Sequence, residues 1–146
     1  YGYISRMDVL QAAILNYRLN SLEGIISKRR KNADFYTKNL NRDFYKIIDE
    51  KKYEYNTYHT FVVQTSKRNQ LINFLKKKGV GTAIHYPIPI HLQPASKYLN
   101  YRKGDFPVTE EQSKRILTIP IHQNLTQKEL KNVVLIMNKF ASDNKK

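Results

Sequence analysis

The stretch "YHTFVVQTSKRNQLINFLKKKGVGTAI", residues 58–84, predicts the order of elements that decides the fold. Its opening "YHTFVVQT" is rich in β-branched and aromatic residues, which is typical of a strand. Ser66 stands where a helix can begin, and the apolar residues of "LINFL" recur on one helical face. Gly79 then predicts the end of that helix, and "VGTAI" predicts another strand. Strand, helix and strand follow one another directly.

The flanking segments extend this alternation. Ser5 and Asp8 form a possible capping box, which predicts a long helix of about 30 residues with a weak point at Gly24. "FYKII" and "ILTI" each predict a short strand. Thr126 and Glu129 form the clearest capping box and open a final amphipathic helix.

Two weaker signals lie between the third and fourth predicted strands. "QPASKYL" predicts a short helix, and Thr109 with Gln112 forms a further possible capping box. A long helix followed by alternating strands and helices indicates a small α+β domain. The pattern leaves the strand order open.

Composition limits the class of protein. The 146 residues are enough for one domain, contain no cysteine for a disulfide or thiolate metal site, and show no apolar run that would span a membrane. We therefore expect a cytoplasmic protein. Because the chain begins with Tyr1 instead of Met, we interpret it as a piece of something longer or as a trimmed chain.

The charge raises nucleic-acid binding as a hypothesis, because the chain has 26 basic and only 12 acidic residues and a net charge of +14. The basic residues are spread along the chain instead of forming one stripe; the clusters are Lys28–Lys31, Lys51–Lys52, Lys76–Lys78 and Lys145–Lys146. This spread favours a solvated lysine-rich surface, with no nucleic-acid partner.

The segment "HYPIPIH", residues 85–91, is the main candidate for chemistry. Pro87 and Pro89 restrict the backbone and remove two donors. No carboxylate within the loop completes a metal-ligand set with His85 and His91, so we predict no metal site. Two interpretations stay open: a rigid turn whose imidazoles cap backbone groups, or a turn that presents side chains to a ligand.

The remaining candidates carry less information. His59 precedes an apolar strand, which favours a structural role, and His122 favours closure of the turn before the last helix. Arg6 is equally consistent with an anion site and with solvation. The sequence has neither a Gly-x-Ser-x-Gly elbow nor a phosphate-binding glycine loop, so we predict no self-sufficient active site.

Several segments together resemble one family. "GYISRMDVLQAAIL" is similar to the "GxNSRMDxLQAAIL" signature of sugar aminotransferases, and "YHTFVV", "TAIHYPIPIHLQPA" and "GDFPVTEEQSKRILTIPIHQNLT" follow in the family's order. The chain resembles the DegT/DnrJ/StrS family, which are fold type I enzymes that use pyridoxal 5'-phosphate to aminate keto-sugars attached to nucleotides.

The resemblance implies a fold and a domain organisation. It places residues 1–42 as an inter-domain and dimer-contact helix and residues 43–146 as a small α+β domain, both from the C-terminal portion of the family. The small domain is expected to hold a few-stranded, largely antiparallel sheet packed against helices. The cofactor-binding N-terminal domain, with its Schiff-base lysine, is not matched, so we assign no catalytic residue in this chain.

The resemblance also implies site residues. His85, Tyr86 and His91 match the loop that borders the sugar-nucleotide pocket of the family. Ser5 and Arg6 match the residues that reach the cofactor phosphate of the neighbouring subunit.

One position departs from the family pattern. Ile4 replaces the family's asparagine, and isoleucine has no amide to donate to the phosphate. We therefore expect weaker cofactor binding or compensation by another group.

The implied activity is the transfer of an amino group, with glutamate as the expected donor, to a nucleotide-linked keto-sugar by a homodimer. It would serve the synthesis of polysaccharide or glycoconjugate precursors. We expect the isolated chain to be inactive and to self-associate through an apolar patch on its first helix. The alternative is a truncated, non-catalytic remnant that acts as an interaction module. Aminating and deoxygenating family members differ at the unmatched lysine, so both chemistries stay open.

Overall fold

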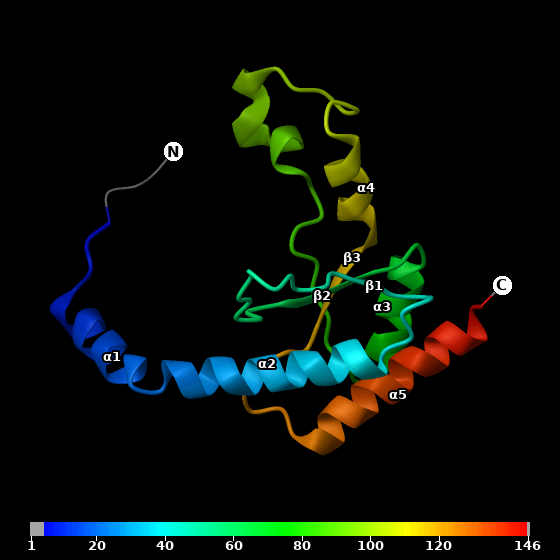
Figure 1. Cartoon of the computed structure of the whole chain (residues 1–146). Coiled ribbons are helices and arrows are strands. Elements are labelled where there is room, and N and C mark those ends of the chain that lie inside the picture. The colour runs from blue at the N-terminus through cyan, green and yellow to red at the C-terminus, as the bar shows by residue number, and fades with distance from the viewer. Residues whose placement is uncertain (1–4, 146) are drawn as a thin grey trace.

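The computed structural model describes residues 5–145 and shows a small sheet with helices on one side and an extended arm, residues 85–106, on the other (Figure 1). The elements in chain order are α1 (Val9–Leu19), α2 (Leu22–Asn39), β1 (Lys46–Ile47), β2 (Phe61–Gln64), α3 (Arg68–Lys77), the 3-10 helices η1 (Ile90–Leu92) and η2 (Pro94–Leu99), α4 (Pro107–Arg115), β3 (Ile116–Ile119) and α5 (Gln127–Asp143). This arrangement confirms the predicted α+β class.

The sheet has the strand order β1-β2-β3, and both pairings are antiparallel. Val63 in the central strand lies opposite Ile47 on one side and Leu117 on the other, and all three side chains are buried. Because strand side chains alternate between faces, this register directs one apolar row towards the helices. The predicted few-stranded antiparallel sheet is confirmed.

The prediction of a full strand over "VGTAI" is wrong. Ala83 alone forms a bridge: its N–H donates to the Thr118 carbonyl at 3.1 Å, and the Thr118 N–H donates to the Ala83 carbonyl at 2.8 Å. Gly79 has a positive φ of 74° and ends the preceding helical turn, as the sequence predicts. The chain then touches the outer edge of β3 briefly and leaves it at His85.

The core lies between the sheet and the helices α2, α3 and α5. It is built largely from aliphatic side chains together with two buried tyrosines, Tyr36 and Tyr45, whose hydroxyls donate to the carbonyls of Pro120 and Met137. Burial therefore leaves no phenol without a partner at these two positions. The largest fully buried side chains are Tyr36, Tyr45, Val63, Leu71, Leu75, Leu117, Ile119, Leu130 and Met137.

The predicted single long helix is two helices. The break falls at Asn20 and Ser21, where the Ser21 N–H donates to the Arg18 carbonyl, whereas Gly24 lies inside α2. The C-terminal half of α2 contributes to the core, but α1 has no buried residue. The boundary between residues 42 and 43 stays a prediction. Within the described residues, no helix combines the length and apolarity that crossing a membrane requires.

The predicted helix caps were only partly correct. Thr126 and Glu129 form the complete reciprocal capping box at the start of α5. At the other expected starts, the N-cap residues are Asp8, Lys67 and Phe106, and none of their side chains bonds to the helix. The capping box also affects Glu129. Hydrogen bonds from the Thr126 backbone N–H and hydroxyl hold the pKa of the Glu129 carboxyl below its usual value.

The confirmed and the rejected caps make a matched pair for a stability measurement. We expect Thr126→Ala to lower the free energy of unfolding by about 1 kcal/mol, because an N–H at the start of α5 loses its acceptor. For a chain of this size this corresponds to a fall of roughly 3 °C in Tm. Thr109→Ala is the control, since Thr109 is exposed within α4 and is expected to change stability by less than about 0.5 kcal/mol. Equal losses in urea melts of the two variants would contradict the assignment.

Candidate functional site

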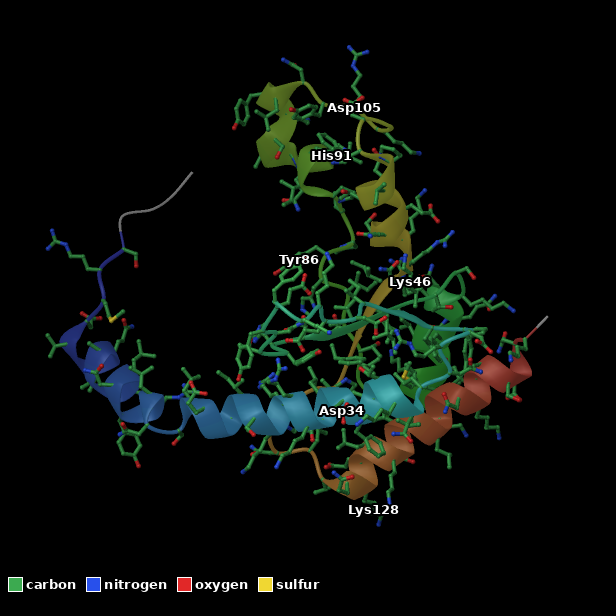
Figure 2. All side chains as sticks on the ribbon, viewed as in Figure 1. Asp34, Lys46, Tyr86, His91, Asp105 and Lys128 are labelled. Carbon is green, nitrogen blue, oxygen red and sulfur yellow. The ribbon has the colours of Figure 1, made fainter. Side chains whose placement is uncertain are left out.

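His85 and Tyr86 lie where the arm leaves the sheet. The His85 Nδ1 and the Thr118 Oγ1 are hydrogen-bonded at 3.0 Å, so a buried hydroxyl on β3 orients the imidazole. The two neighbouring rings meet edge to face, with centroids 5.5 Å apart and planes at 89°. The arrangement leaves His85 Nε2 available for a ligand, and the Tyr86 side chain is 70% exposed (Figure 2).

His91 has different surroundings. Its Nε2 lies 3.1 Å from Glu110 Oε1, and the two side chains are only 8% and 10% exposed. The His91 ring also packs against Phe106 at a centroid distance of 4.7 Å. Figure 2 shows His91 farther along the arm than Tyr86. The imidazole is therefore engaged inside the arm instead of being free at a pocket rim.

Glu110 is a site residue that sequence reasoning missed. Its Oε1 accepts the Gly104 N–H at 2.7 Å, and this bond, together with His91, holds the pKa of the carboxyl below its usual value. The favoured state of this buried carboxyl is therefore the charged one. No spacing rule links positions 91 and 110, so the pairing carries no signal in the sequence.

A groove of about 490 Å³ runs beside His85. It is lined by the two residues before β2, by the segment that bridges to β3 through Ala83, and by the end of β3 with the two residues after it. The lining residues are His59, Thr60, Gly81, Thr82, Ala83, His85, Thr118, Ile119, Pro120 and Ile121. The structural contact of His59 is made by its backbone: the carbonyl accepts a hydrogen bond from Arg29 at 3.1 Å. Its exposed side chain lines the groove with that of His85.

The predicted role of His122 is confirmed. Its carbonyl accepts hydrogen bonds from the Asn32 side chain at 2.8 Å and from the Leu125 N–H at 3.3 Å. Its ring nitrogen Nδ1 accepts from the Asn124 N–H at 3.2 Å. The residue closes the turn that leads into α5 and contributes to no groove described above.

Ser5 and Arg6 lie at a second, separate place. They line a groove of about 520 Å³ together with Met7, Gln11, Ile14 and Leu15 from the start of α1. A hydroxyl and a guanidinium, both exposed, are a donor pair that fits a phosphate group. Ile4, the position that departs from the family pattern, lies outside the described residues.

The chain does not join these two groups of residues. Figure 1 shows the stretch before α1 well away from the arm, with open space between them. Residues 5–145 also contain no group of three or more His, Asp or Glu side chains arranged to hold a metal ion. The two groups therefore line two separate grooves.

Much of the exposed apolar surface lies on the same two parts of the molecule. Along and just before α1, the large exposed side chains are Met7, Val9, Leu10, Ile14, Leu15, Tyr17 and Leu19. On the arm they are Tyr86, Ile88, Ile90, Leu92, Tyr98, Leu99, Tyr101 and Phe106. Extended apolar surface of this kind marks places where another protein surface or a ligand is met.

The chain belongs to the DegT/DnrJ/EryC1/StrS aminotransferase family, whose model matches residues 1–138. It is 35% identical over 91% of its length to a pleiotropic regulatory protein of Geobacillus stearothermophilus. It is 31% identical over 96% of its length to the dTDP-3-amino-3,6-dideoxy-alpha-D-galactopyranose transaminase of Aneurinibacillus thermoaerophilus. The predicted family is confirmed.

The fold agrees with this assignment. The crystal structure of S. venezuelae DesV in complex with a ketimine intermediate superimposes with a TM-score of 0.88 and 28% identity over 96% of this chain. The chain covers 38% of DesV and 37% and 38% of the two relatives above. It therefore spans little more than a third of their length, and it is a sugar-transaminase-like region.

Proposed function

We propose that this chain forms one wall of the active site of a cytoplasmic nucleotide-sugar aminotransferase. The amino donor would be glutamate and the acceptor a keto-sugar attached to a nucleoside diphosphate. The observation that carries the proposal is the exposed His85–Tyr86 pair at the sheet edge, held by Thr118 beside an open groove. The similarity to a dTDP-sugar transaminase supports the substrate class.

In this proposal His85 and Tyr86 bind the substrate. An imidazole nitrogen can donate to or accept from a sugar hydroxyl, and the exposed tyrosine ring offers an apolar face with a polar tip. The prolines on either side of Ile88 reduce the conformational freedom that the loop would lose on binding. His91 supports the loop from within the arm.

Pyridoxal 5'-phosphate is the cofactor that the family resemblance implies. Ser5 and Arg6 would hold its phosphate edge, since their hydroxyl and guanidinium suit a phosphate and their groove is open. When bound, the cofactor supplies the electron sink that amino-group transfer requires. The residues described above orient the phosphate and the sugar; we assign the proton transfers to no side chain of this chain.

A homodimer would explain the separation of the two walls. If Ser5 and Arg6 of one subunit serve the site bordered by His85 and Tyr86 of the other, each chain contributes to two sites. The exposed apolar side chains of α1 and the arm support such an interface.

The substrate wall predicts a binding pattern that can be mapped. We expect dTDP-glucose, added to the ¹⁵N-labelled chain, to shift the amide signals of residues 82–86, 88, 118, 119 and 121, the prolines 87 and 120 having no N–H. The dissociation constant should lie in the millimolar range, worth about −4 kcal/mol, because one wall alone makes contact.

Tyr86→Ala should weaken this binding at least about fivefold. Tyr53→Ala, which removes a similarly exposed tyrosine that does not line the groove beside His85, should leave it unchanged. Shifts confined to the lysine clusters, or equal effects of the two variants, would remove the proposal. A steep loss of binding with salt would instead support a general anion or nucleic-acid surface.

The absence of a matched Schiff-base lysine gives a second prediction. We expect borohydride reduction of the chain with pyridoxal phosphate to label exposed lysines diffusely, and the chain to show no transaminase activity. Peptide mass mapping checks this directly. Stoichiometric label on one defined lysine, blocked by nucleotide sugar, would show that the chain holds a complete cofactor site.

A non-catalytic interaction module is the second candidate, and the unpartnered apolar surface of α1 is the observation that favours it. Both candidates predict self-association, which sedimentation velocity measures. We expect Leu15→Glu to shift the chain towards the monomer, with Lys28→Glu as a charged control outside α1. A chain that stays monomeric at about 100 μM would argue against an interface on α1.

A further inference from the structure

The arm, defined as residues 85–106, is attached to the domain without a hydrophobic core of its own. None of its apolar residues is buried, and the buried apolar core skips from Val80 to Leu117, whereas the polar His91 side chain is only 8% exposed. The arm nevertheless carries the substrate-facing pair His85 and Tyr86 at its base. Polar contacts must therefore contribute strongly to holding its two limbs in register.

Glu110 makes the contact that joins both limbs. Its Oε1 meets His91 on the outgoing limb at 3.1 Å and accepts the Gly104 N–H on the returning limb at 2.7 Å. The carboxylate is buried, and a buried charge is retained only where hydrogen bonds compensate its lost hydration. Removing the carboxylate would break both hydrogen bonds at once.

Aromatic packing closes the same junction. The Phe106 ring lies between His91, at a centroid distance of 4.7 Å, and Tyr101, at 5.0 Å. The His91–Phe106 contact therefore joins the outgoing and returning limbs at the same place as the Glu110 hydrogen bonds.

The helix that carries Glu110 is fastened to the domain. The Arg68 side chain donates to the Ser113 carbonyl at 2.6 Å, and the Thr65 N–H donates to the Arg115 carbonyl at 3.1 Å. α4 therefore connects the arm to the end of β2 and to the start of α3.

We propose that Glu110 is a positioning residue that latches the arm through His91 and Gly104 and so fixes the orientation of the loop that presents Tyr86. The functional meaning of this latch rests on the proposed substrate site. The latch itself is a property of the free chain, so it is tested without any ligand.

The test measures backbone order by ¹⁵N relaxation. In the unaltered chain, Ile88, Ile90 and Ser96 should show order parameters near the rigid value of about 0.85. Glu110→Ala should lower them below about 0.6, while Val63 and Leu117 in the sheet stay rigid.

Two further variants separate latching from general stability. Glu110→Gln keeps an acceptor for the Gly104 N–H and should restore part of the order. Glu111→Ala removes the neighbouring exposed carboxylate, whose ion pairs within residues 5–145 are with Lys114 and Arg115 alone, and should leave the arm unchanged.

The proposal is overturned if Glu110→Ala leaves the arm rigid, if arm and sheet loosen together, or if Glu111→Ala has the same effect. Should Glu110→Ala fail to fold, His91→Phe carries the test, because it keeps the contact with Phe106 and removes only the hydrogen bond. An ordered arm in that variant would equally overturn the latch. Loss of order with unchanged dTDP-glucose affinity would keep the latch and reject its link to the substrate site.

Discussion

A row of polar side chains along α2 is the interaction on which the rest of the structure depends. Arg29, Asn32 and Tyr36 follow one another on one helical face and donate to backbone carbonyls of residues 58–59 and 120–122. The first segment enters β2 and the second leaves β3. The row satisfies carbonyls that lie outside the sheet ladder, and it fixes the two ends of the antiparallel pair against the helix.

This row also sets the geometry of the candidate site. The groove beside His85 lies between the same two segments, so its walls are spaced by the helix that holds them. Thr118, one residue from the end of β3, then orients the imidazole. The position of the groove, of His85 and of the start of the arm thus all depend on the hydrogen bonds that hold α2 against the ends of β2 and β3. The arm beyond them depends on separate polar contacts.

Much of the fold could be predicted from local sequence because local physics decides it. The Thr126 capping box needs only its own residues, and the composition of "YHTFVVQT" marks a strand; both are confirmed, the strand over Phe61–Gln64. The sequence predicts a weak point at Gly24, but the helix breaks at Asn20 and Ser21. Gly24 lies within α2, which packs on the core, whereas α1 has no buried residue. The single bridge at Ala83 was read as a strand because its apolar composition says nothing about how many partners the sheet edge offers.

The site divides in the same way. Family motifs pointed to His85, Tyr86 and His91 together, but the fold exposes the first two and places the third against Glu110. The Glu110 contact joins residues 19 apart in sequence, and it exists only because the arm folds back on α4. No periodicity encodes such a return. Burial of a carboxylate is the signal that reveals it, and burial is known only from the structure.

We propose that a stable core carries two incomplete surfaces, α1 and the arm, which another protein surface completes. Amide hydrogen exchange on the dilute, monomeric chain tests this most directly. We expect slow exchange in β2, β3 and α5 and nearly unprotected exchange in α1, since an 11-residue helix without buried residues is marginal in water. Protection should appear in α1 as the chain associates at higher concentration. If α1 of the monomer exchanged as slowly as α5, α1 would be a finished part of the domain, and the claim would be contradicted.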